Sequence, residues 1–190
     1  MSEEIKNAGR DAEWRKALRD AMPAKERAAI PRVVMPQLDP DYRITCNEEV
    51  NQGLSADQAV LEATRCLDCP QPTCVEGCPV NIAIPDFIKN IQRGEVLEAA
   101  TVLKRTSALP AVCGRVCPQE RQCESRCIYN KMKKKPVAIG YLERFAADSA
   151  IAAAKEGKTE APKAPSSNGI RVAVAGSGPA GLSFAGSMAA

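Results

Sequence analysis

Hydrophobic positions recur at helical spacing through most of this 190-residue chain. Residues 11–22 place apolar side chains on one face until Pro23 interrupts the pattern, which predicts a peripheral N-terminal helix. Residues 31–54 carry several prolines and Gly53 without apolar periodicity, which is typical of an extended surface segment. We therefore expect residues 1–54 to form an N-terminal helix followed by an extended arm.

The next unit is predicted over residues 55–154 and is mainly α-helical. It opens at Ser55, which has the spacing of a capping box with Gln58. An apolar stripe follows the box and is made of Ala59, Val60, Ala63 and Leu67. This pattern predicts a helix that places Cys66 at its carboxyl end.

Two helices are predicted beyond residue 80, where they form a hairpin. Pro85 suits the first position of one helix, which Gly94 ends, and residues 95–106 repeat the apolar pattern. A long helix is expected over residues 137–154 because its apolar positions keep helical spacing. The hairpin is expected to serve as a scaffold.

A further helical segment is expected after Pro118. It would carry Cys123 and Cys127, which are spaced i and i+4 and would therefore share one face of a helix. The four lysines between Lys131 and Lys135 follow this segment. They form either a docking patch for an acidic partner or a solvated loop, and both readings stay open.

Charge and hydropathy exclude several classes of protein. The chain has 26 Lys and Arg residues against 23 Asp and Glu, so charge indicates no nucleic-acid or anionic-membrane partner. No apolar run reaches the ~18 residues of a transmembrane helix. The N-terminus lacks the apolar core of a signal peptide, and many reduced thiols are typical of a cytoplasmic protein, which is the location we expect.

Cysteine is the most informative residue type in this chain, which contains no histidine. Eight of the nine cysteines form two runs: Cys66, Cys69, Cys74 and Cys78, and then Cys113, Cys117, Cys123 and Cys127. The first run reads C-x2-C-x4-C-x3-C-P, which is close to the ferredoxin pattern C-x2-C-x2-C-x3-C-P. Thiolate ligation of two iron-sulfur clusters is the prediction.

Two other uses of cysteine are less consistent with the pattern. Disulfides need an oxidising compartment, for which the N-terminus gives no signal. Structural zinc sites normally use two C-x2-C pairs, whereas only Cys66 and Cys69 have this spacing here. A zinc-stabilised interaction module without redox role is kept as the alternative function. Cys46 stands apart and is expected to be an ordinary small side chain.

The spacing also indicates how the ligands are shared. The fourth cysteine of a ferredoxin run reaches the neighbouring cluster. One cluster would then take Cys66, Cys69, Cys74 and a distant thiolate, while Cys78 would join cysteines of the second run. The residues alone leave the distant thiolate and the last ligand of the second cluster open.

The composition changes after the long helix. Residues 155–169 are rich in Ala, Lys, Glu, Pro and Ser and predict a linker. Residues 170–175 read as a buried strand that leads into a G-x-G-x-x-G turn and a helix, which is the context of a dinucleotide-binding fingerprint. Residues 170–190 are therefore expected to be the truncated start of a Rossmann-type α/β domain for FAD. The candidate binding residues are Gly176, Gly178, Pro179, Ala180 and Gly181.

These motifs together resemble a known family. The strings Arg65-Cys66-Leu67-Asp68-Cys69, Cys74-Val75-Glu76-Gly77-Cys78-Pro79 and Cys113-Gly114-Arg115-Val116-Cys117-Pro118 resemble the small (β) subunit of NADPH-dependent glutamate synthase. They are equally similar to the large subunit of the electron-bifurcating NADH-dependent ferredoxin:NADP oxidoreductases. A more distant resemblance is to the N-terminal domain of dihydropyrimidine dehydrogenase. The resemblance covers roughly residues 30–190.

The resemblance implies a fold, cofactors and ligands. It implies an α-helical ferredoxin-like domain with two [4Fe-4S] clusters, followed by an FAD domain and an NAD(P)H domain. The first cluster would take Cys66, Cys69, Cys74 and Cys127. The second would take Cys78, Cys117, Cys123 and a ligand that is not cysteine, which the family pattern places at Glu143. Proximity in sequence favours Cys113 instead, so both residues are considered.

The function implied is electron transfer within a larger oxidoreductase. Hydride from NAD(P)H would enter at the flavin, and the clusters would pass single electrons to a partner subunit. That partner would be a glutamate synthase large subunit or a ferredoxin-reductase-like subunit. This stretch of chain by itself is expected to transfer electrons without substrate chemistry, and neither the product nor the direction of flow follows from the sequence.

Overall fold

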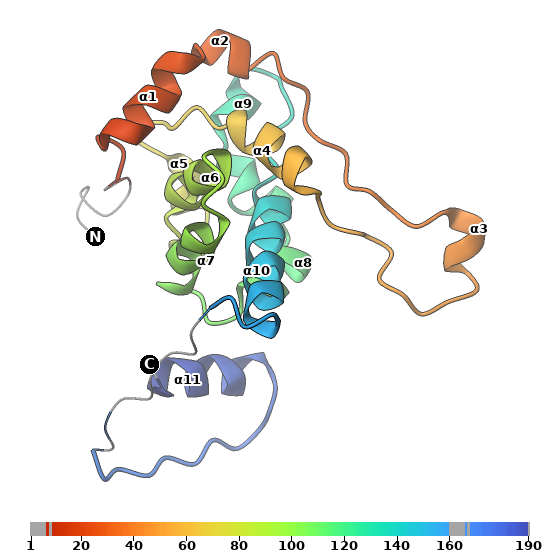
Figure 1. Cartoon of the computed structure of the whole chain (residues 1–190), viewed down its shortest axis with the longest axis vertical. Helices are drawn as coiled ribbons and strands as arrows, with labels where there is room; N and C mark the ends of the chain where they lie inside the picture. Colours follow the sequence, from red (N-terminus) through yellow and green to blue (C-terminus); the bar gives the residue numbers. More distant parts are fainter. Residues whose placement is uncertain (1–6, 8, 160–165, 167, 190) are drawn as a thin grey trace.

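The computed structural model describes residues 7, 9–159, 166 and 168–189, and within these ranges it is helical and contains no β-strand (Figure 1). The α-helices are α1 (Glu13–Ala21), α2 (Ala24–Arg27), α3 (Pro40–Arg43), α4 (Ala56–Thr64), α5 (Thr73–Glu76), α6 (Ile84–Gln92), α7 (Val96–Lys104), α8 (Pro110–Val116), α9 (Ile128–Lys131), α10 (Ile139–Lys155) and α11 (Pro179–Ala189). Two 3-10 helices are η2 (Gln119–Arg121) and η3 (Glu124–Arg126). The mainly helical class predicted from the sequence is confirmed.

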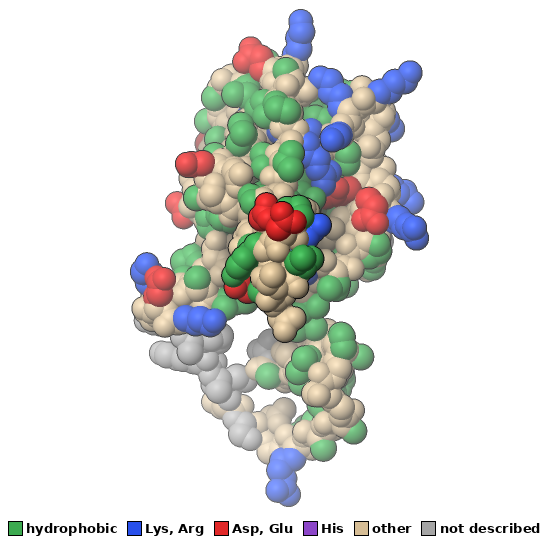
Figure 2. Space-filling view, turned by 90° about the vertical axis from the view of Figure 1, so that its right-hand side faces the viewer, with side chains coloured by type: hydrophobic (Ala, Val, Ile, Leu, Met, Phe, Trp, Pro, Cys, Tyr) green, Lys and Arg blue, Asp and Glu red, His purple; other side chains and the backbone are tan. Residues whose placement is uncertain are grey.

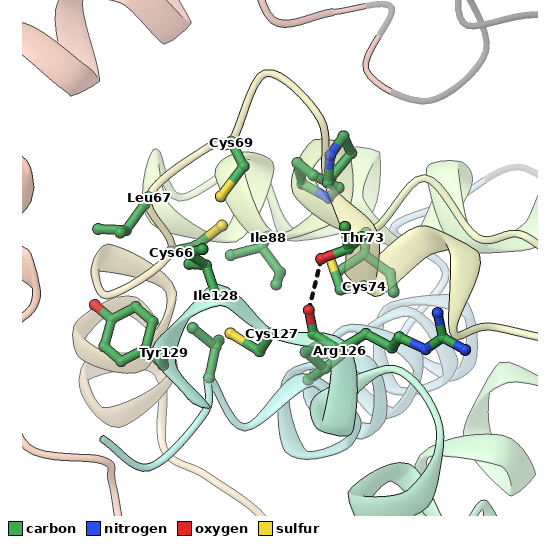
Figure 3. Close-up of a pocket in the computed structure, with 15 residues that line it drawn as sticks. Cys66, Leu67, Cys69, Thr73, Cys74, Ile88, Arg126, Cys127, Ile128 and Tyr129 are labelled. Carbon is green, nitrogen blue, oxygen red and sulfur yellow. Dashed lines mark hydrogen bonds between the residues drawn. The ribbon is translucent and has the colours of Figure 1, made fainter. Parts of the chain in front are cut away.

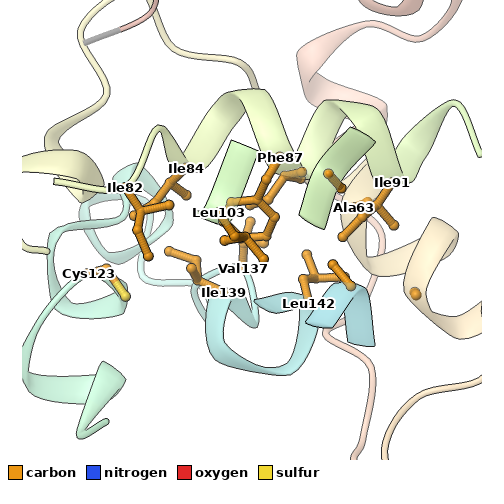
Figure 4. Close-up of a cluster of buried hydrophobic side chains, with 14 of the residues drawn as sticks. Ala63, Ile82, Ile84, Phe87, Ile91, Leu103, Cys123, Val137, Ile139 and Leu142 are labelled. Carbon is orange, nitrogen blue, oxygen red and sulfur yellow. The ribbon is translucent and has the colours of Figure 1, made fainter. Parts of the chain in front are cut away.

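The hydrophobic core lies between α4, α6, α7 and α10 (Figure 4). Phe87 and Ile91 of α6, Leu103 of α7 and Leu142 of α10 have no exposed surface. The predicted hairpin of α6 and α7 is confirmed, and Gly94 joins its helices with a φ of 87°, which suits glycine. The core packs beside the segments that carry the cysteines.

Helix α4 confirms the predicted capping box. The Ser55 side chain accepts from the backbone N–H of Gln58, and the Gln58 side chain accepts from the N–H of Ser55. Cys66 follows the end of the helix, as predicted. The predicted stripe was wrong in one position, because Val60 is exposed and Glu62 is buried instead. Glu62 is buried because its carboxylate binds Arg65 and two backbone N–H groups.

The segment after Pro118 is not the predicted continuous helix. It consists of η2 and η3, and Cys117 and Cys127 both have extended backbone with ψ near 135°. Proline supplies no backbone N–H and fixes its own φ, which interrupts the helix that precedes it. Cys123 and Cys127 therefore do not share one face of a helix, and that prediction was wrong. Helix α8 had not been predicted, although Pro110 at its start is a typical signal.

Residues 31–54 form an arm that projects from the helical body (Figure 1). The arm contains the short helix α3 and one antiparallel bridge between Gln37 and Asn51. Glu49 fixes its base to the body through Arg115 at 2.8 Å and Arg144 at 3.1 Å. Cys46 lies on this arm and is partly exposed. Apart from α3 and the bridge, these residues have no regular secondary structure.

The predicted strand over residues 170–175 is absent from the described part of the chain. These residues are extended and exposed, and the same segment and α11 expose Ile170, Val172, Val174, Leu182, Phe184 and Met188 (Figure 2). A strand requires a partner for its backbone groups, and no described segment pairs with this one. The helix predicted after the glycines does form, as α11. In the described residues, no helix is both long and apolar enough to cross a membrane.

Helix α8 crosses α10 at a glycine, which leads to a stability prediction. A Cβ at Gly114 would lie 2.6 Å from the backbone nitrogen of Arg144, and backbone cannot move as freely as a side chain. Gly114→Ala is expected to lower the free energy of unfolding by about 1–3 kcal/mol, as overpacked cores do. The measurement is anaerobic urea unfolding. Gly186→Ala is the control, because a Cβ there meets Ala108 at an ordinary 3.5 Å. Unchanged stability of the Gly114 variant would contradict the close packing.

Candidate metal centre

Four cysteines line one apolar pocket. Cys66 and Cys69 follow α4, Cys74 lies in α5, and Cys127 follows η3. Figure 3 shows these four side chains around the same space, with Ile88 of α6 beside them. The two cysteine runs are joined here, because the Thr73 hydroxyl donates to the carbonyl oxygen of Arg126 at 2.6 Å. The structure brings together the four residues expected to bind the first cluster.

The pocket can hold ionised thiolates only when a positively charged group compensates their negative charge. Burial raises the pKa of Cys69 to about 11, with the neighbouring thiols of Cys66 and Cys127 adding to the effect. Burial also raises the pKa of Cys74 well above its usual value, with Cys66 and Cys127 as the next causes. Close thiolates repel one another in a medium of low dielectric. A bound cationic group removes this repulsion, and its binding releases the thiol protons.

A second group lies where α8, η2, η3 and α10 meet. Burial raises the pKa of Cys117 to about 11, and Cys113, Glu143 and Cys78 add to the shift. Burial raises the pKa of Cys123 to about 12, and Glu124, Cys78 and Glu143 contribute. These mutual effects show that the residues expected to bind the second cluster lie close together.

Glu143 is the most unusual member of this second group. Its side chain is 6% exposed, and its Oε1 atom is buried without a hydrogen-bond partner among the described residues. Burial raises the pKa of this carboxyl group to about 7. A buried carboxylate without a partner is costly unless it binds a cation or metal. The donor set and this orphaned oxygen fit a metal-binding group.

Cys113 also lies beside the second group. Its side chain is within hydrogen-bonding reach of Cys117, and its Sγ atom is 3.8 Å from the Ser107 hydroxyl. Unlike Glu143, it therefore has a polar partner outside the group. In the described part of the chain, no three His, Cys, Asp or Glu side chains are arranged to hold a single ion. The ligands of a cluster bind different irons and need not converge on one point.

An ion-pair network holds the loop between Cys66 and Cys69. Asp68 has a φ of 54° and no exposed surface in its side chain. Its carboxylate binds Arg15 and, at 2.6 Å, Arg19, both from α1. Arg15 also binds Asp86 of α6. Sequence reasoning missed this network, because α1 and the loop are about 50 residues apart and no local signal links them.

Two buried cations lie next to Cys66 and were also missed. The Lys89 ammonium of α6 donates to the carbonyl oxygen of Cys66 at 2.5 Å and to Gln92 at 2.8 Å. Arg27 donates to the same carbonyl at 3.3 Å and to that of Thr64 at 3.1 Å. Burial lowers the pKa of Lys89 to about 8, so it remains mostly protonated near neutral pH. In the sequence, Lys89 lies between the apolar residues Ile88 and Ile91 of a predicted helix, and this position is the signal that could have indicated its burial.

The glycine-rich turn lies apart from the cysteines. Gly176, Gly178, Pro179 and Ala180 are exposed, and Gly176 has a φ of 107°. A Cβ at Gly181 would lie 2.3 Å from the carbonyl oxygen of Gly176, so the turn requires glycine there. The glycine-rich segment is thus a tight turn before a helix, and its use in binding FAD stays a prediction.

The lysines between Lys131 and Lys135 are exposed as well.

Comparison with known proteins defines the class of this site. Residues 43–155 match the sequence profile of the family described as dihydropyrimidine dehydrogenase domain II, 4Fe-4S cluster. The match covers more than half of the chain and includes all eight clustered cysteines. The chain therefore belongs to this family of iron-sulfur domains.

Its relatives are oxidoreductases. The chain is 40% identical over 175 residues to the putative oxidoreductase UacF of Escherichia coli, covering 90% of this chain and 27% of the relative. It is 40% identical over 137 residues to the small chain of NADPH glutamate synthase of Escherichia coli, covering 72% and 28%. It is 34% identical over 135 residues to the PreT subunit of NAD-dependent dihydropyrimidine dehydrogenase of Escherichia coli, covering 71% and 32%. The chain thus spans about a third or less of each of these relatives.

Proposed function

We propose that this chain is the electron-transfer module of a cytoplasmic NAD(P)H- and FAD-dependent oxidoreductase of the glutamate synthase small-subunit type. Two [4Fe-4S] clusters would supply one-electron chemistry. Cys66, Cys69, Cys74 and Cys127 would hold the first, and Cys78, Cys117, Cys123 and Glu143 the second. The turn at Gly176, Gly178 and Gly181 would bind the FAD pyrophosphate in the longer protein. Electrons would pass between the flavin and a partner oxidoreductase subunit.

The observation that carries this proposal is the division of the ligands into two groups. One group lines the pocket beside Ile88, and the other surrounds Glu143, whose Oε1 atom has no hydrogen-bond partner among the described residues. Each group draws on both cysteine runs, so neither run is a self-contained site. The 4Fe-4S family match and the oxidoreductase relatives support the same chemistry.

The comparisons with known proteins are consistent with two enzyme types within the proposal. The glutamate synthase small chain and the dihydropyrimidine dehydrogenase subunit PreT both match the chain over about 70% of its length. An electron-bifurcating ferredoxin:NADP oxidoreductase subunit is the third possibility, which rests on the sequence resemblance. Co-purification of the full-length protein with its partner subunit separates these types.

Metal content tests the proposal directly. The chain purified without oxygen is expected to contain about eight irons and eight acid-labile sulfides, because each cubane contributes four of each. It should be brown, and its absorbance should bleach with dithionite. Four irons in fully loaded protein would contradict the two-cluster assignment. A colourless protein with stoichiometric zinc would support the zinc-stabilised interaction module instead.

A further inference from the structure

The two ligand groups have different electrostatic surroundings. Arg27 and Lys89 lie beside the first group and are 2% and 0% exposed. Within the described residues neither forms an ion pair, and their donors meet carbonyl oxygens and the Gln92 amide. Their charges are thus not neutralised by a carboxylate in direct contact. Both side chains converge on the carbonyl of Cys66.

The carboxylates near the first group are already matched by other cations. Asp68 binds Arg15 and Arg19. Glu62 binds Arg65 at 2.6 Å, with both side chains almost fully buried. The charges that remain unmatched around the Cys66 pocket are therefore positive.

The second group faces carboxylates. Glu143 lies within it, and Glu124 is close enough to raise the pKa of Cys123. Glu124 is matched by Arg32 at 2.7 Å, whereas Glu143 has no cationic partner in the part of the chain that the structure describes. The Arg144 side chain, next in sequence, points to Glu49 and Asp148 instead. Glu143 is itself a proposed ligand and carries the same charge as the thiolate it replaces, so what distinguishes this group is that no buried cation without a carboxylate partner lies beside it among the described residues.

Reduction of a cluster adds one negative charge and breaks no bond. A buried cation stabilises the reduced form, and a buried anion destabilises it, because charges interact strongly where water is excluded. Local charge, hydrogen bonds and burial are the factors by which a protein sets cluster potentials. The buried cations beside the first group therefore favour reduction of the cluster held there.

We propose that Arg27 and Lys89 raise the reduction potential of the cluster held by Cys66, Cys69, Cys74 and Cys127 above that of the cluster at Cys78, Cys117, Cys123 and Glu143. The first cluster is then the one that holds the electron when the module is singly reduced, with the flavin of the longer enzyme as donor. This inference rests on the proposed function. Arg27 and Lys89 are positioning residues, since they touch the backbone of a ligand residue and not the ligand atom.

The test is a potentiometric titration of the full 190-residue chain, loaded anaerobically and followed by electron paramagnetic resonance. Cys117→Ser assigns the signals, because it removes a thiolate from the second group alone. Lys89→Met is expected to shift the potential of the first cluster downwards and to leave the second in place. Lys89→Arg, which keeps the charge, should match the wild type. Lys104→Met is the control, because Lys104 is an exposed lysine on α7 without contact to either group.

A purely structural role for Lys89 would lower the melting temperature without moving the potential of one cluster selectively. Where Lys89→Met fails to load the first cluster, Arg27→Gln carries the same test, since Arg27 donates to the same carbonyl. The inference is overturned if both neutral variants leave the potential unchanged, or if Lys89→Arg shifts it as much as Lys89→Met. An equal shift of both clusters also overturns it.

The metal content separates this inference from the proposed function. About eight irons in the wild type with no selective shift in the variants would leave the two-cluster module standing and remove the role of the cations. A wild-type chain without clusters would overturn both.

Discussion

Glu143→Ala is expected to halve the iron content of the anaerobically loaded chain, from about eight to about four atoms. The reason is that Glu143 supplies the only carboxylate oxygen of the second group that is buried and has no hydrogen-bond partner in the described structure. Removing it would leave three cysteines for the proposed second cluster and would not touch the first. Iron and sulfide assays measure the loss, and electron paramagnetic resonance shows which cluster remains.

Two variants serve as controls for Glu143. Cys113→Ser should keep both clusters, because the Cys113 thiol has Ser107 as a partner outside the group. Asp148 is a partly exposed residue of the same helix, and its carboxylate binds Arg115 and Arg144. Asp148→Ala removes this carboxylate and should also keep both clusters. If Cys113→Ser falls to about four irons and Glu143→Ala keeps eight, Cys113 is the ligand. Glu143 would then be a buried carboxyl group whose pKa is raised by burial but which binds no metal.

Glu62→Ala is expected to lower the free energy of unfolding by about 3–5 kcal/mol, because it removes one partner of a buried ion pair. The Glu62 carboxylate binds Arg65 at 2.6 Å and accepts the backbone N–H groups of Val33 and Ala138, each at 2.8 Å. These contacts join α4 to the beginning of the arm and to the start of α10. The variant would leave the Arg65 charge buried without its carboxylate.

The Glu62 prediction is measured by urea unfolding of the iron-loaded protein without oxygen. Glu98→Ala is the matched control, because Glu98 pairs with Arg105 at 3.7 Å where both side chains are about half exposed. Such a surface pair contributes about 0–1 kcal/mol. A decrease in the free energy of unfolding below about 1 kcal/mol for Glu62→Ala would contradict the prediction. It would show that the backbone carbonyls bound by Arg65 stabilise its charge without the carboxylate.

The local patterns of the chain predicted the scaffold well. The capping box at Ser55 and Gln58, the stop at Gly94 and the long helix α10 all depend on interactions between residues a few positions apart. Such interactions are readable in sequence because a helix fixes the neighbours of each residue at three and four positions. The continuous helix predicted after Pro118 was wrong, because the chain forms two short 3-10 helices there and the backbone of Cys127 is extended.

The candidate site was predictable in its residue types and less so in its surroundings. Cysteine spacing and the family resemblance singled out the eight candidate ligands, and the structure gathers them into two groups. Neither the spacing nor the resemblance indicated that Lys89 and Arg27 meet at the carbonyl of Cys66. Lysine and arginine are usually exposed, so the sequence favoured a solvated position for both.

What the sequence by itself determined is the chemistry of the chain: cysteines in an iron-sulfur pattern within a mainly helical fold. What only the tertiary structure decided is the electrostatic setting of that chemistry. Asp68 meets Arg15 from 53 residues away, and Glu143 is buried among cysteines of two runs with no cation beside it in the described structure. The physical reason is the distance in sequence over which each interaction acts. A helix cap involves residues within one turn, whereas the energy of a buried charge depends on every group that the fold brings near it.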